Sequence, residues 1–279
     1  SYSALASTFP KTSRIFFAAF TGYPPAISHS VSIIEALLAA EQGVKYISLG
    51  YGQNGNLRQD VAAVHSLEEL ACEYLKEYGF EDVEITTVFH QWLGGFPQEE
   101  AKAYGIISLG ATAAALANST KVVVKTPQEA LKSPDKDSNV AGLKNTKQIV
   151  DMLEAQSFEK SAEYDLEKEM IKKEVREIME KVLELGEGDL AQGVLKAFET
   201  GVIDIPFSPS KYNSGEMLPA RDIQGAVRYL NFGKLPFSQE IKQFHREKID
   251  ERAVKEQKNA GFQMAIDDIY AIGKGLLKG

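Results

Sequence analysis

The sequence is poor in cysteine, with Cys72 as the only one among 279 residues. A single thiol cannot build a disulfide framework, a Cys-rich zinc site or a four-thiolate cluster, so iron–sulfur radical chemistry is excluded within this chain. Neither H-E-x-x-H nor catalytic-triad spacing links the four histidines, which are scattered at His29, His65, His90 and His245. The sequence therefore argues against metallohydrolase and serine-hydrolase functions, and we expect no metal site.

Long apolar runs and an excess of positive charge are also lacking. The most apolar run, residues 109–117, is far shorter than the roughly 20 residues that span a bilayer, and the N-terminus has no apolar signal-peptide core. Lysine and arginine number 31 against 39 aspartate and glutamate residues, a formal net charge of -8. Binding to nucleic acids or membrane surfaces uses clustered positive charge instead. We therefore expect a cytoplasmic protein that binds neither a membrane nor a nucleic acid.

The first half of the chain contains four strand-like segments, each followed by a helical pattern. They are residues 14–21, 45–50, 83–89 and 121–125, and they begin 31 to 38 residues apart. This interval is the length of a βα unit, which predicts an α/β fold with parallel strands joined by crossover helices.

The second half is mainly helical in pattern. Residues 163–185 carry an apolar stripe at helical spacing amid many charges, which predicts a helix with one buried face. A stretch rich in proline and glycine follows, and then a charged helix and a final amphipathic one. We therefore expect residues 1–158 to form the βα part and residues 159–279 to form a helical extension that packs on it.

Four parallel strands leave open how the sheet closes. An eight-stranded barrel has no free edges, whereas half of one leaves two long parallel edges and an unfilled interior. Such a chain should either pair with another half or fold as an open, doubly wound sheet.

In a barrel and in an open, doubly wound sheet alike, ligands bind at the C-terminal ends of the strands. After the second strand, Gly50, Gly52 and Gly55 allow close backbone approach to a ligand, or they serve a turn with positive φ angles. Their spacing is not that of the dinucleotide fingerprint. After the third strand, His90 and Trp92 either line the pocket of a planar ligand or form a hydrogen-bonded core histidine and a packed tryptophan.

Lys125 ends the fourth strand, where its ammonium group could hold an oxygen-rich ligand or form a Schiff base. Thr126 and Glu129 have capping-box spacing, and Pro127 stands at the expected first helical position. The role of Glu129 could therefore be purely local, as a cap of the helix N-terminus. A carboxylate at this place can also accept two hydrogen bonds from a sugar diol. Both roles can hold together.

Two motifs in the first half of the chain are distinctive, TTVFHQWLGGFPQ at residues 86–98 and VVVKTPQEA at residues 122–130. Together with residues 34–44, 197–222 and 262–275, they are similar to the larger, epsilon subunit of glutamate mutase, also called methylaspartate mutase. The resemblance runs from about Thr21 to the end.

The resemblance implies an adenosylcobalamin-dependent mutase that interconverts L-glutamate and threo-3-methylaspartate by radical chemistry. Its fold is a TIM barrel, of which this chain would supply about four βα units, a half barrel, together with the mainly helical extension. The family residues that contact the adenosyl side of the cofactor match Phe96, Lys125 and Glu129. A further contact falls at Ser133, where this chain departs from the apolar residue of the family. The resemblance implies that Lys125 and Glu129 hold the ribose and that Phe96 packs at the coenzyme. It assigns no catalytic residue to this chain.

The resemblance also implies partners. A separate small subunit brings the cobalamin in a D-x-H-x-x-G motif, which does not occur here. The family's first barrel half, which supplies the arginines that clamp the substrate, begins before this chain, so we expect an N-terminal barrel half or a second copy as a further partner and L-glutamate as the substrate. Two alternatives stay open: a non-catalytic half barrel with an assembly or regulatory role, and an unrelated open-sheet enzyme with Lys125 as a Schiff-base lysine.

Overall fold

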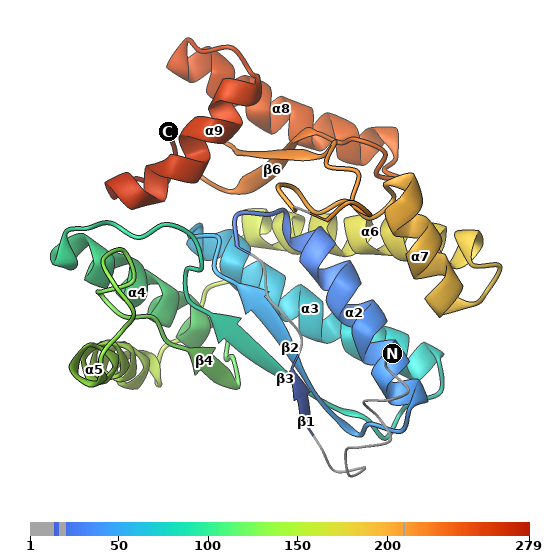
Figure 1. The fold of residues 1–279 in the computed structure, drawn as a ribbon, viewed down its shortest axis with the longest axis horizontal. Coiled ribbons are helices and arrows are strands. Elements are labelled where there is room, and N and C mark those ends of the chain that lie inside the picture. Colours follow the sequence, from blue (N-terminus) through green and yellow to red (C-terminus); the bar gives the residue numbers. More distant parts are fainter. Residues whose placement is uncertain (1–13, 17–20, 209) are drawn as a thin grey trace.

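The computed structural model describes residues 14–16, 21–208 and 210–279, which form a mixed α/β fold (Figure 1). Its main sheet contains four parallel strands in the order β1-β2-β3-β4. The strands are β1 (Arg14–Phe16), β2 (Tyr46–Gly52), β3 (Glu84–His90) and β4 (Lys121–Val123). The prediction of four parallel strands is therefore confirmed, although residues 17–20 of the first predicted strand lie outside the described residues.

Each strand is followed by a helix, as the spacing predicts. These helices are α2 (Pro25–Glu41), α3 (Leu57–Glu77), α4 (Glu100–Leu116) and α5 (Lys136–Leu153). The order of the strands across the sheet is the same as their order in the sequence. Each successive strand is therefore added at the same edge of the sheet.

Ser32 and Glu35, and again Ser66 and Glu69, have the S-x-x-E spacing of a capping box, which predicts helix starts at these serines. Helices α2 and α3 begin earlier than that. Helix α2 starts with Pro25 in its first turn, and the side chain of Asn56 caps α3 by accepting the backbone N–H of Gln59 at 2.9 Å. Ser66 lies inside α3 and donates to the carbonyl of Ala63 instead. A serine in a helix interior can bond the preceding turn in this way, so the motif alone did not locate the helix start.

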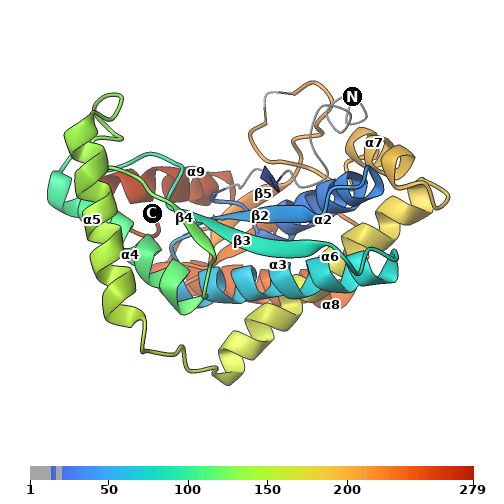
Figure 2. The ribbon, with the colours of Figure 1, turned by 90° about the horizontal axis from the view of Figure 1, so that it is seen from below.

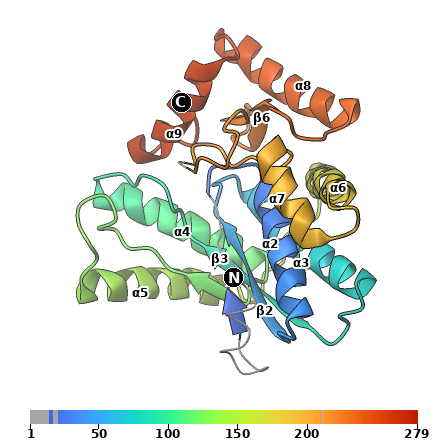
Figure 3. The same cartoon turned by 45° about the vertical axis from the view of Figure 1, so that its right-hand side comes forward.

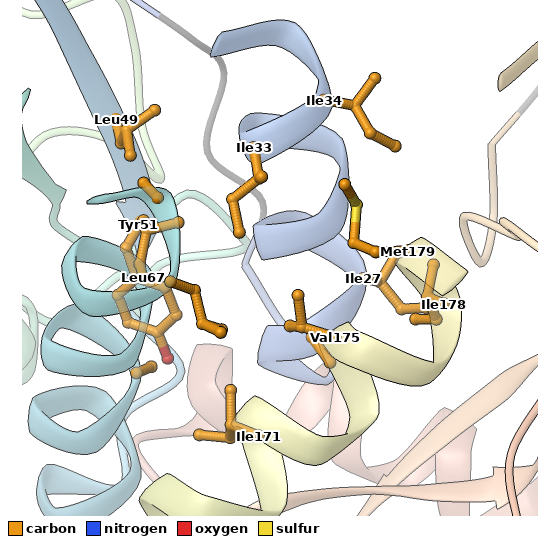
Figure 4. Close-up of a cluster of buried hydrophobic side chains, with 14 of the residues drawn as sticks. Ile27, Ile33, Ile34, Leu49, Tyr51, Leu67, Ile171, Val175, Ile178 and Met179 are labelled. Carbon is orange, nitrogen blue, oxygen red and sulfur yellow. The ribbon is translucent and has the colours of Figure 1, made fainter. Parts of the chain in front are cut away.

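One face of the sheet packs against helices and forms the main core. Leu49 and Tyr51 of β2 point to this face and meet apolar residues of α2, α3 and the long helix α6 (Ala162–Leu185) (Figure 4). The predicted apolar stripe of α6 is buried here, including Ile171 and Val175. Figure 2 shows α6 crossing beside α3, so the second half of the chain contributes directly to the core of the first.

The hairpin and the last two helices of the chain lie beyond one end of the sheet, whereas α7 (Leu190–Thr200) packs against α6 and α2 (Figure 3). Helix α7 follows α6, and an antiparallel hairpin of β5 (Leu218–Arg221) and β6 (Val227–Asn231) packs beside helices α8 and α9. These last helices and the turn after them are α8 (Gln239–Glu256), α9 (Phe262–Ala271) and η1 (Ile272–Lys274). A division of the chain near residue 158 stays a prediction.

Buried charges join the hairpin to the helices. Arg228 of β6 donates two hydrogen bonds to Glu167 of α6, at 2.8 and 2.7 Å, and a third to Asp222 at 2.8 Å. Gln59 of α3 donates to Glu167 at 2.7 Å and accepts the backbone N–H of Val227 at 2.8 Å. Three separate segments therefore share one satisfied polar network, which fixes the hairpin against α3 and α6.

Candidate functional site

Buried amide side chains connect the loops that follow the strands. Gln53, after β2, accepts the backbone N–H of Trp92, after β3, at 3.0 Å. Asn54 accepts the N–H of Gly22 at 2.7 Å and donates to the carbonyl of Tyr23 at 2.9 Å. The structural role of these amides was not predicted from the sequence. A polar residue directly after an apolar strand was the available signal, because such a residue must find partners when it is buried.

The glycine-containing loop after β2 is held from within. Asp60 accepts the hydroxyl of Tyr51 at 2.8 Å and the backbone N–H groups of Asn54 and Gly55 at 2.8 and 2.9 Å. Burial raises the pKa of Asp60 to about 6, although these hydrogen bonds oppose the shift. Gly55 has a φ of +93°, and a Cβ atom there would lie 2.9 Å from the side chain of Leu277. In this structure the close approach at Gly55 is therefore made by the chain itself, within a turn.

Lys125 and Glu129 form an ion pair at the C-terminal end of β4. The Lys125 Nζ lies 3.3 Å from a carboxylate oxygen of Glu129, and the two side chains are 21% and 22% exposed. The other Glu129 oxygen accepts the backbone N–H of Thr126 at 3.4 Å, which is half of the predicted capping box. No helix starts here, however, because Pro127 opens a turn and α5 begins only at Lys136. The expected first-turn helical position of Pro127 was therefore wrong.

This turn also contains buried polar atoms without a partner. Thr126 Oγ1 and Gln128 Oε1 are enclosed and make no hydrogen bond within the described residues. Buried polar atoms in folded proteins are usually paired, so unpaired ones beside a partly exposed ion pair mark a place where polar groups of a ligand or water would be accommodated.

His90 faces the same corner as Lys125. The register of β3 and β4 places His90 beside Val123, and Lys125 follows Val123 by two residues. Burial lowers the pKa of His90, and the positive charge of Lys125 lowers it further. The ring is half-buried and makes no hydrogen bond within the described residues, so it is not the hydrogen-bonded core histidine that was the alternative interpretation.

The aromatic candidates are largely packed. Phe96 and Trp92 belong to a buried cluster with Ile272, and Ala130, next to Glu129, packs against it. The Trp92 indole N–H donates to the carbonyl of Gly95 at 3.0 Å. Trp92 is therefore a packed tryptophan that also lines a cavity, and its contact with a planar ligand stays a prediction.

Ser133 is exposed and lies in the bend that follows the Lys125–Glu129 turn. The structure thus brings Lys125 and Glu129 into direct contact and places the cluster of Phe96 against the same turn. The described residues contain no group of three or more His, Cys, Asp or Glu side chains arranged to hold a metal ion. None of the helices in the described part of the chain has the length and apolar character needed to cross a membrane.

Comparison with known proteins identifies relatives over nearly the whole chain. Residues 12–279 match the family described as "Methylaspartate mutase E chain (MutE)". The chain is 60% identical over 256 residues to the glutamate mutase epsilon subunit of Desulfitobacterium hafniense, a match that covers 92% of this chain and 53% of that relative. With the same coverage, it is 54% identical to the subunit of Treponema denticola and 46% identical to that of Halobacterium salinarum.

The chain therefore spans about half the length of these curated relatives. The family match, by contrast, includes every strand and helix described above. The resemblance found in the motifs around residues 86–98 and 122–130 is thus confirmed by alignment over most of the sequence, and the chain belongs to the methylaspartate mutase E chain family.

Proposed function

We propose that this chain is the coenzyme-binding part of a glutamate mutase epsilon subunit, in which Lys125 and Glu129 hold the ribose of adenosylcobalamin. The observation that carries the proposal is the partly exposed ion pair of these residues at the C-terminal end of a parallel strand. Family membership supports the assignment, because the relatives are glutamate mutase subunits by name.

The side chains present fit a ribose. A carboxylate accepts hydrogen bonds from both hydroxyl groups of a diol, and an ammonium group donates to its oxygens. Glu129 keeps acceptor capacity because, within the described part of the chain, its side chain contacts one N–H and one ammonium group. The unpaired Thr126 Oγ1 and Gln128 Oε1 add polar capacity in the same turn.

Adenosylcobalamin, when bound, supplies the homolytic cobalt–carbon chemistry that carbon-skeleton rearrangement needs. The contribution of this chain is to bind and orient the adenosyl group. The buried cluster of Phe96 and Trp92 gives the site an apolar wall that excludes water. Ser133, exposed at the end of the turn, is proposed as a peripheral contact.

The proposal includes the fold of the complete barrel. Sequential strand order is how TIM barrels grow, whereas a doubly wound sheet reverses its order at a switch point. We therefore take the four βα units as half of a TIM-type barrel, completed by an N-terminal half or a second copy. The other proposed partners are a small cobalamin-binding subunit and the substrate L-glutamate.

Coenzyme affinity tests the proposal. Glu129→Gln keeps most of the local geometry but removes the charge that strengthens hydrogen bonds to a diol. In the complete assembly with the small subunit, we expect adenosylcobalamin to bind at least about tenfold more weakly, while the free energy of unfolding falls by less than about 1 kcal/mol. Lys132→Met, which removes a surface pair with Asp135 nearby, is the matched control.

The outcomes separate the alternatives. Equal coenzyme affinity in wild type and Glu129→Gln leaves Glu129 with a local role only. An assembly that forms without binding coenzyme supports the non-catalytic subunit. Borohydride trapping with a carbonyl substrate leaves a stable adduct on Lys125 only if that lysine forms a Schiff base. Formation of 3-methylaspartate from L-glutamate, measured with and without a supplied N-terminal half, tests which part holds the substrate.

A further inference from the structure

A cavity of about 260 Å³ lies between the loops after β1 and β3 and the C-terminal elements. Tyr23 and Gly95 belong to the loops, Ala220 and Arg221 to the hairpin, and Ala265 and Ile269 to α9. Most of its lining is apolar. The ion pair of β4 does not line it, whereas Trp92, from the wall of the proposed coenzyme site, does. The cavity therefore adjoins that site but does not include the ribose contact.

Arg221 brings a positive charge into this apolar lining. Its side chain is 3% exposed, and its Nη1 donates to the carbonyl of Gly225 at 2.7 Å. Its other two side-chain nitrogens, Nε and Nη2, make no hydrogen bond within the described residues. Neither of them is among the polar atoms that are both completely buried and unpaired. Within the same described ranges, Arg221 forms no ion pair. These two nitrogens are therefore the donors available to the cavity.

The carboxylates around Arg221 are directed at other donors. Asp268 accepts Arg252 Nη1 at 2.7 Å and the backbone N–H of Arg221 at 2.6 Å. Asp222 pairs with a different arginine, and Asp60 is bonded to the loop after β2. They balance the charge of Arg221 through space, but none occupies its free donors. A buried guanidinium with unused donors is costly unless an anion can reach it.

Nε and Nη2 lie on one edge of a guanidinium and match the two oxygens of a carboxylate. The mainly apolar walls suit a hydrocarbon chain. The other charged residue of the described lining, Asp268, is already bonded to Arg252 and to two backbone N–H groups. We propose that this cavity binds a small aliphatic monocarboxylate, with its carboxylate on Arg221 and its hydrocarbon part against Ala265 and Ile269. This inference does not rest on the proposed mutase function.

Trp92 provides a direct readout, because it is the only tryptophan in the sequence and lines the cavity. The intact protein, without coenzyme, is titrated with butyrate while its tryptophan emission is recorded. We expect a saturable change with butyrate and none with butyramide, its uncharged analogue, at the same concentrations. Arg221→Met should weaken butyrate binding at least about tenfold. The control Arg246→Met, at an exposed arginine of α8, should not.

A second variant keeps the arginine and fills the space. Ala265→Leu narrows the cavity from α9 and should also weaken butyrate binding, and thermal unfolding of each variant verifies its fold. If Arg221→Met does not fold, Ala265→Leu decides alone.

Equal responses to butyrate and butyramide, or wild-type affinity in the folded variants, would overturn the site. Displacement of butyrate by an equal concentration of L-glutamate would overturn the assigned ligand class. No coenzyme or turnover enters these measurements, so they fail or succeed independently of the mutase proposal.

Discussion

The side-chain oxygen of Gln91 accepts the backbone N–H of Lys125 at 2.8 Å. The same amide group donates to the carbonyl of Ile107 at 3.1 Å and to the hydroxyl of Thr146 at 3.0 Å. One buried side chain after β3 therefore fixes the end of β4 and two neighbouring helices. The place of the Lys125 ammonium group depends on an amide that belongs to the adjacent strand.

Replacement of this amide should destabilise the protein. Gln91→Met keeps the approximate volume but leaves the backbone N–H of Lys125 and the hydroxyl of Thr146 without the amide as their partner. Burying such groups unpaired should lower the free energy of unfolding by about 1 to 3 kcal/mol, measured by urea denaturation. Gln98→Met, at an exposed position of the same loop, is the control. Equal stability of the two variants would show that the amide is dispensable.

The strands were predictable because their signal is local. Four apolar segments at βα spacing predicted the parallel sheet, and the stripe at residues 163–185 matches α6 to within one residue. Helix starts were less predictable, since serines at S-x-x-E spacing proved to be interior residues of α2 and α3. The hairpin of β5 and β6 was not predicted, because its stability comes from distant partners such as Glu167 and Gln59.

The site was predictable only in part, for a similar reason. Lys125 and Glu129 are four residues apart, so their contact follows from local spacing. Arg221 and Trp92 line one cavity although 129 positions separate them, and only the folded chain brings them together. Local patterns therefore located the ion pair but gave no indication of the arginine cavity.

Asp60 should make stability depend on pH. Burial raises its pKa from 3.8 to about 6 in the folded protein, so between these values the folded state keeps a proton that the unfolded state has lost. The contribution of Asp60 to stability is therefore complete below about pH 4 and is lost as the pH rises through about 6. Relative to Asp60→Asn, which cannot titrate, wild type should lose at most about 3 kcal/mol over this range.

Chemical denaturation of both proteins at several pH values between 4 and 7 measures this difference. Asp250→Asn, at an exposed position of α8, controls for the general effect of removing a carboxylate. A stability difference between wild type and Asp60→Asn that rises with pH would contradict the raised pKa.

The buried network around Arg228 should be costly to break. Glu167→Gln removes the carboxylate that binds two of the arginine nitrogens and leaves Asp222 as its remaining anion. Loss of one partner from a buried pair should reduce the free energy of unfolding by about 3 kcal/mol. Glu169→Gln, on an exposed position of the same helix, should have little effect.

A double variant distinguishes the ion pair from simple packing. Glu167→Met combined with Arg228→Met removes both charges. The loss of unfolding free energy in this double variant should be smaller than the sum of the losses in Glu167→Met and in Arg228→Met alone. Additive effects would show that the two side chains contribute independently.

The outer edge of β4 should make the 279-residue chain associate. Within the described residues β4 pairs with β3 alone, and Val123 is 39% exposed at this edge. Helix α5, which follows β4, exposes Leu143 as well. An open parallel edge beside apolar side chains favours pairing with another chain.

Sedimentation velocity of the isolated chain should therefore show mass above that of a monomer, increasing with concentration, and Val123→Asp should shift the distribution toward monomer. Leu195→Asp, a change at a more exposed apolar position on α7, should leave it unchanged. A wild-type chain that stays monomeric at every concentration would show that the open edge of β4 does not pair with another chain.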